Sequence, residues 1–203
     1  MTGGFDRPLR GIAVGVVLGL TTSVADHVVV WLGQEGLARG DRSAAGQVAD
    51  FVSLILDSGW AWAAAAVLAG WLACRAGGRL WTAAVSGSLA LIVGTLIFYG
   101  WRGELATPIT EVWLAASVIL GPVLGMVGGL TRRLGWIGAL AALVVPAGAV
   151  LNILWRPVDP NSPLARPITV LIIAAASAAA VAILFRVGRR RRRHASSPSH
   201  ASG

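Results

Sequence analysis

The chain has 203 residues, of which 56% are hydrophobic and only 13% are charged, about half the charged share of an ordinary soluble domain. This composition excludes a water-soluble globular protein, because a soluble surface needs more charge than the chain supplies. The formal net charge of +8 would indicate nucleic-acid binding in a soluble domain. Much of that charge lies in the C-terminal tail, however, and nucleic acid is not an expected partner.

Apolar segments long enough to cross a bilayer follow one another along the chain. A spanning helix uses about 20 residues, so six spans with short loops fill nearly the whole length. The sequence therefore predicts an all-α fold, an integral membrane bundle of six transmembrane helices. The predicted parts are a cytoplasmic N-terminus at 1–10, a transmembrane domain at 11–187 with spans at about 11–32, 51–74, 80–100, 109–130, 135–155 and 168–185, and a disordered polybasic cytoplasmic tail at 188–203.

The first span follows a basic start, so it could instead be a signal peptide. It is long for a signal peptide, and Val24-Ala25-Asp26 is a poor cleavage site. We therefore expect it to remain as a membrane span.

The segment at 44–57 allows two interpretations. Its apolar residues recur at helical spacing, and its polar residues occupy other positions. It is either an interfacial amphipathic helix or the outer end of span two. The apolar residues are Val48, Phe51, Val52 and Ile55, and the polar ones are Asp50, Ser53 and Asp57.

The arginines are distributed unevenly between the two sides of the membrane. If the N-terminus lies inside, the inner segments hold twelve arginines and the outer segments hold five, which places both termini in the cytoplasm. Every basic residue is Arg, and Ala, Gly and Val are abundant, so we expect a multi-pass protein of the bacterial cell (inner) membrane. The inner arginines are Arg7, Arg10, Arg75, Arg79, Arg132, Arg133, Arg186 and Arg189 to Arg193, and the outer ones are Arg39, Arg42, Arg102, Arg156 and Arg166.

Two predicted spans carry glycine at every fourth position. Glycine at this spacing leaves a smooth groove that lets a neighbouring helix approach closely. The pattern predicts tight helix packing, within the chain, in a homo-oligomer or against a partner membrane subunit. These packing positions are Gly11, Gly15 and Gly19 in span one and Gly121, Gly125 and Gly129 in span four.

Acidic residues gather on the predicted outer side. Asp26 and His27 lie roughly 10 Å inside the outer end of span one, and a carboxylate at that depth usually faces a cavity or a partner. Together with Asp57 and Glu111 they predict an outward-facing acidic pocket. The alternative is a set of interfacial charges in which Asp26 pairs with His27 or a nearby Arg. Only one histidine lies in the predicted spans, so neither a metal site nor a cofactor is expected.

The tail carries five consecutive arginines beside the end of the last span. A cluster in this position anchors the topology and contacts anionic lipid headgroups. The expected contact residues are Arg189, Arg190, Arg191, Arg192 and Arg193. The lipid bilayer itself is the other expected partner.

Several short motifs in the central two fifths of the chain, from Ser58 to Arg133, resemble a family of small polytopic bacterial membrane proteins, a family defined by a domain of unknown function. The resemblance implies a multi-span membrane protein and supplies no activity or catalytic residue. The motifs are Gly59-Trp60-Ala61-Trp62, Ala73-Cys74-Arg75, Phe98-Tyr99-Gly100, Trp113 and Gly121-Pro122-Val123-Leu124-Gly125.

The sequence contains no nucleotide-binding, zinc-protease or serine-hydrolase motif, which favours a protein that is not an enzyme. The first hypothesis is a small transport-related or solute-binding membrane protein with the acidic pocket as its site. The second is a membrane-embedded enzyme that uses a buried carboxylic acid on a lipid or isoprenoid substrate. The third is a structural or regulatory protein that binds a partner through its glycine faces.

Overall fold

The structure is a computed structural model that describes residues 6–75, 79–133, 135–155 and 164–195. Within these ranges the chain is helical throughout apart from short connections, and no strand is present, which confirms the all-α prediction. The elements are α1 (Asp6–Trp31), the 3-10 turn η2 (Arg39–Asp41), α2 (Ala44–Leu56), α3 (Gly59–Arg75), α4 (Leu80–Trp101), α5 (Pro108–Leu130), α6 (Trp136–Trp155) and α7 (Ala165–Ala195).

Five of the described helices, α1, α4, α5, α6 and α7, are each long and apolar enough to cross a membrane. Helices α2 and α3 meet at a bend of 60° and give a sixth span if the pair is counted as one. The chain is thus a multi-pass helical membrane protein. The single second span expected at 51–74 is two helices, and the segment at 44–57 is largely a helix of its own.

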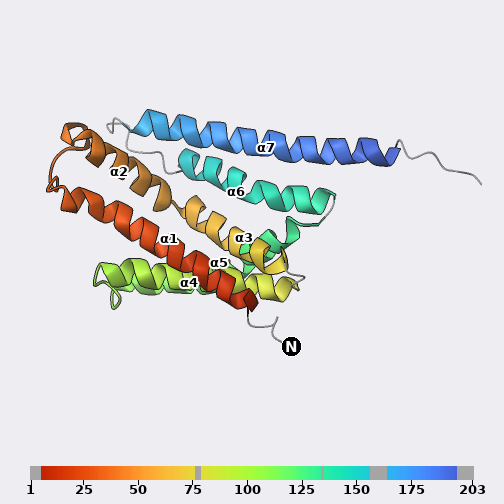
Figure 1. Ribbon diagram of the computed structural model, residues 1–203, viewed down its shortest axis with the longest axis horizontal. Coiled ribbons are helices and arrows are strands. Elements are labelled where there is room, and N and C mark those ends of the chain that lie inside the picture. Colours follow the sequence, from red (N-terminus) through yellow and green to blue (C-terminus); the bar gives the residue numbers. More distant parts are fainter. Residues whose placement is uncertain (1–5, 76–78, 134, 156–163, 196–203) are drawn as a thin grey trace, which may run out of the picture.

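The helices lie side by side along the long axis of the molecule (Figure 1). Helices α1, α3, α4 and α5 pack against one another as one group, and α6 contacts both α3 and α5. Helix α7 packs mainly on α6 and lies along the edge of the bundle. The group of four therefore forms the centre, and the α6–α7 pair flanks it.

The interior of the bundle is made mainly of small side chains, and most of the large apolar ones face outward. Most of the largest fully buried side chains are hydroxyl-bearing, such as Thr22, Thr95 and Thr110. In contrast, Leu154 is 74% exposed and Trp155 is 89% exposed. A water-soluble protein rarely exposes so much large apolar surface, whereas small interior residues are typical of helices that pack within lipid.

Helix α1 contacts α4 along its glycine face. A Cβ atom added to Gly15 would lie 2.5 Å from the Ala90 carbonyl oxygen, and one added to Gly19 would lie 2.8 Å from the Gly94 carbonyl oxygen. Gly11 makes the same kind of approach to the backbone of Ser86. The two backbones can lie this close only because no side chain separates them.

Helix α5 approaches α4 through Gly121 and Gly125, and Gly129 packs against the side chain of Cys74 on α3. Gly128 also lies directly against the α3 backbone at Val67, although it falls outside the four-residue spacing of the sequence pattern. One helix thus uses two glycine rows to contact two neighbours.

The break between α2 and α3 has a local cause and a tertiary one. The hydroxyl of Ser58 donates to the Ile55 carbonyl oxygen at 2.5 Å, which offers the backbone an alternative to continuing the helix. The tertiary cause is that Phe51 on α2 and Trp60 on α3 both pack against a buried cluster between α6 and α7. The members of that cluster are Ala149, Ile153, Ile168 and Ile172.

Helix α7 continues beyond the predicted end of span six at residue 185, through the five arginines to Ala195. The sequence predicted disorder from residue 188, whereas the helix persists for about two further turns. Arginine is a good helix former, and cations near a helix C-terminus interact favourably with the helix dipole. The remainder of the predicted tail, 196–203, lies outside the described residues.

Candidate polar cavity

Asp26 links three elements at one end of the bundle. It lies on α1, and its Oδ2 atom accepts a hydrogen bond of 2.5 Å from Nη2 of Arg102, the residue that follows α4. Its Oδ1 atom accepts a longer hydrogen bond of 3.4 Å from the Ser53 hydroxyl on α2. The carboxylate therefore ties α1 to the end of α4 and to the polar face of α2.

Arg102 is held by more than this ion pair. Its guanidinium lies over the ring of Phe98, with Cζ 4.7 Å from the ring centroid, a cation–π arrangement. Partial burial lowers the pKa of Arg102, but the hydrogen bond that Arg102 donates to Asp26 and the charges of Asp26, Glu104 and Asp57 outweigh it, so the pKa is raised. The guanidinium is a permanent cation at this position.

A second ion pair lies nearby. Nη1 of Arg42 donates to both carboxylate oxygens of Asp50 on α2, at 2.5 and 2.6 Å. Asp50 is only 8% exposed, and it is the one charged side chain among the buried residues that the structure describes. A buried carboxylate requires such a partner, so Arg42 fixes the connection between α1 and α2 onto α2.

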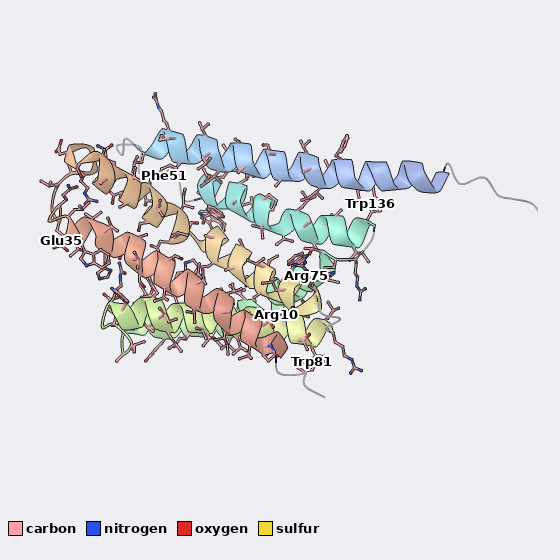
Figure 2. All side chains as sticks on the ribbon, viewed as in Figure 1. Arg10, Glu35, Phe51, Arg75, Trp81 and Trp136 are labelled. Carbon is pink, nitrogen blue, oxygen red and sulfur yellow. The ribbon has the colours of Figure 1, made fainter. Side chains whose placement is uncertain are left out.

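These groups surround a cavity of about 410 Å³ between α1, α2 and the connection that joins them. Its charged lining consists of three carboxylates, from Asp26, Glu35 and Asp50, and one guanidinium, from Arg42. Glu35 has no ion pair with any side chain that the structure describes. Figure 2 shows Glu35 at the end of the bundle opposite to Arg10. The remaining lining residues are Ala25, Val29, Val30, Gly36 and Ser53.

The four residues of the predicted acidic pocket have different positions. Asp26 lines the cavity, and Asp57 lies close enough to Asp26 and Arg102 for their charges to act on it. Glu111 is exposed in the first turn of α5. Within the described chain it has no hydrogen bond or ion pair with the other three. The alternative in which Asp26 pairs with a nearby Arg describes the observed geometry better.

His27 belongs to an aromatic group. Its Nδ1 atom lies 3.0 Å from the Ser23 carbonyl oxygen, and because a carbonyl only accepts, this nitrogen carries the proton. The ring packs edge-on against Trp101, with centroids 5.9 Å apart, and at a tilt against Trp31 at 6.4 Å. The histidine therefore connects the C-terminal ends of α1 and α4.

Five residues of the site were not among the predicted ones: Glu35, Arg42, Asp50, Ser53 and Arg102. A signal for two of them was present, because Asp50, Ser53 and Asp57 recur at helical spacing opposite the apolar residues of α2. That polar face is the one turned toward Asp26. In contrast, no local pattern distinguishes Arg42 or Arg102 from the other loop arginines.

The expected lipid-contact arginines, Arg189 to Arg193, lie in the last turns of α7, and their side chains are outside the described part of the chain. Across the described ranges, no group of three His, Cys, Asp or Glu side chains is arranged to hold a metal ion. No family model, curated protein or solved structure matches the chain. The resemblance to a family of small polytopic membrane proteins therefore remains a prediction.

Proposed function

We propose that the protein is a small solute-binding, transport-related membrane protein whose polar cavity takes a cationic or polar solute. The observation that carries this proposal is the lining of the cavity, in which Asp50 and Asp26 are paired with Arg42 and Arg102, while Glu35 has no ion pair among the described side chains and leaves an excess negative charge. The excess negative charge attracts cations, and a volume of about 410 Å³ lies within the range of small-molecule sites.

The rest of the interior supports a site reached from one end of the bundle. The buried polar groups between α1, α4 and α5 are hydroxyls, such as Thr22, Thr95 and Ser117. A proton-coupled pump usually needs ionisable groups along its path, and Asp50 is the only carboxylate, and Tyr99 the only other ionisable side chain, in the described buried core. Binding of a solute at the cavity is therefore favoured over proton-driven pumping.

Two of the three cavity carboxylates are poorly suited to an enzyme that protonates a lipid. That chemistry needs a carboxylic acid free to donate its proton to the substrate. Asp26 and Asp50 both accept hydrogen bonds from guanidinium groups, and a carboxylate in that role is an acceptor only.

We also infer that the protein lies in a bacterial inner membrane with both termini in the cytoplasm. The support is the excess of arginine at the end of the bundle that holds Arg10, Arg75 and Arg133. In that orientation the polar cavity opens toward the outside of the cell.

The proposed binding is tested by thermal unfolding of the purified protein with choline and putrescine as cationic probes. We expect at least one probe to raise the unfolding temperature of the parent protein, because a ligand that binds only the folded state stabilises it. The shift should be lost in Glu35→Gln, which removes a cavity charge without breaking an ion pair between described side chains.

Glu111→Gln is the matched control, because it removes the same charge from an exposed position outside the cavity. It should retain the full shift. If neither probe stabilises the parent protein, or if Glu35→Gln and Glu111→Gln respond alike, the cavity is not a cation site.

A further inference from the structure

A second and larger cavity lies at the opposite end of the bundle. It is a groove of about 860 Å³ between α1 and α3, with Leu56 of α2 also in its wall. The groove occupies the side of α1 next to its glycine face. It shares no lining residue with the polar cavity, so its role can be considered separately.

The walls of the groove are apolar. On α1 the lining residues include Val14, Val17 and Leu18, and on α3 they include Leu68 and Leu72, which recur at the spacing of one helix face. The hydroxyl of Thr21, also in the wall, donates to the Val17 carbonyl oxygen at 2.6 Å within its own helix. The walls therefore offer no unpaired polar group to a ligand and fit a hydrocarbon chain.

Two arginines close one end of the groove. Nη1 of Arg10 donates to the Leu72 carbonyl oxygen at 2.9 Å across the groove, and Cζ of Arg75 lies 5.6 Å from the centroid of the Trp71 ring. Figure 2 shows Arg10 and Arg75 toward the same end of the bundle, on neighbouring helices. No carboxylate among the described side chains pairs with either guanidinium, so within the described part of the chain both positive charges at this end are available to an anionic group.

The dimensions of the groove match one leaflet of a bilayer. Its lining on α1 extends from Arg10 to Thr21, which is roughly 16 Å at 1.5 Å per residue. The hydrocarbon core of a bilayer is about 30 Å thick, so one leaflet contributes about half of that. A lipid whose headgroup lies at Arg10 could therefore lay one acyl chain along the groove.

The geometry points to a specific site for an anionic phospholipid, with one acyl chain between α1 and α3 and the headgroup phosphate at Arg10 and Arg75. Arginine is well suited to this role because its planar guanidinium donates two parallel hydrogen bonds to a phosphate. Apolar walls alone would accept any lipid chain, and the two arginines are what select an anionic headgroup.

The test is native mass spectrometry of the full chain, released from detergent that contains equal amounts of phosphatidylglycerol and phosphatidylcholine. We expect one phosphatidylglycerol to remain bound in preference to phosphatidylcholine. The double variant Arg10→Gln/Arg75→Gln should lower that preference about a hundredfold, since each of the two lost charge-assisted hydrogen bonds is worth about a tenfold change in affinity. Arg79→Gln/Arg133→Gln removes the same charge from exposed positions at that end and should leave the preference unchanged.

A second variant separates the groove from the headgroup contacts. Ala65→Phe fills the groove with an apolar side chain and leaves both arginines in place, so it should abolish retention of the lipid. Glycerol phosphate, which has the headgroup chemistry without the chains, should not displace the lipid at equal concentration. The proposal is overturned if both lipids are retained equally, if the two double variants behave alike, if Ala65→Phe retains the lipid, if glycerol phosphate competes fully, or if a second copy of the chain occupies the groove.

Discussion

Asp26 and Arg102 illustrate how a charge within a membrane span, near its end, obtains a partner from a distant part of the chain. Asp26 lies within α1, and Arg102 follows the last turn of α4. The side chains are about one-third exposed, at 32% and 36%, which limits the strength of the ion pair. The cation–π contact between Arg102 and the Phe98 ring adds to the stability of this arrangement.

The ion pair is testable with a double-mutant cycle of Asp26→Asn and Arg102→Gln. We expect a coupling free energy of about 1 kcal/mol, because partly exposed pairs rarely contribute more. The measurement is the midpoint of unfolding in a detergent and denaturant titration. Pairing Asp26→Asn with Arg133→Gln provides a control cycle, for which the coupling should be close to zero. Equal coupling in both cycles would contradict the pair.

The sequence identified Asp26 but not its partner, and the reason is physical. A carboxylate within an apolar run is conspicuous because its burial is costly, so it can be found without a structure. The choice of Arg102 over Arg39 or Arg156 depends on how α1 lies against α4. That register is set by contacts along the whole length of the two helices rather than by local sequence.

At the level of elements, the glycine face of α1 determines the register of the central group. Gly15 lies against the α4 backbone at Ala90, and a larger residue there would force the helices apart. Gly148 on α6 is also within a helix, but a Cβ atom there would meet nothing within 4 Å. The two glycines thus have the same chemistry and opposite surroundings.

We therefore expect Gly15→Ala and Gly148→Ala to have opposite effects on stability. Gly15→Ala should lower the free energy of unfolding by about 1–3 kcal/mol, because the added methyl group overpacks the α1–α4 contact. Gly148→Ala should be neutral or stabilising by up to about 1 kcal/mol, since alanine favours the helix. The measurement is the unfolding of both variants in the same detergent. A loss of stability in Gly148→Ala alone would contradict the conclusion that Gly15 is closely packed and Gly148 is not.

The helix positions followed closely from the hydropathy of the sequence, with α4, α5 and α6 beginning or ending within a residue of the expected spans. The break in the helix at Asp57 and Ser58 could not be predicted from hydropathy. Those residues are compatible with either a polar helix end or a continuous helix. The choice depends on Phe51 and Trp60 packing against α6 and α7, which come roughly a hundred residues later in the chain.

For the molecule as a whole, the two ends of the bundle have different chemistry. One end holds the polar cavity with its excess of carboxylates, and the other holds arginines above an apolar groove. The number of spans could be predicted because hydropathy is a local property, whereas the partition of functions between the two ends could not. Predicting that partition requires knowing which loops and helix ends lie together in the fold.

The orientation of the two ends is testable with single cysteines introduced into a Cys74→Ala background. Ala38→Cys and Ala106→Cys lie in connections at the cavity end, and Arg133→Cys lies in a turn at the other end. With both termini in the cytoplasm, a membrane-impermeant maleimide should label the first two in intact cells. It should label the third only after the membrane is permeabilised, and the reverse pattern would invert the proposed orientation.

The interior of small side chains has a further consequence for how the sequence can change over time. On the outside, one large aliphatic residue can replace another at little cost, because the surrounding lipid adapts to its shape. Inside, where Ser86, Gly87 and Ala90 are buried side by side, even one additional methyl group would disturb the close packing of the helices. Substitutions among homologues would then be limited by volume in the centre of the bundle and by polarity at its periphery.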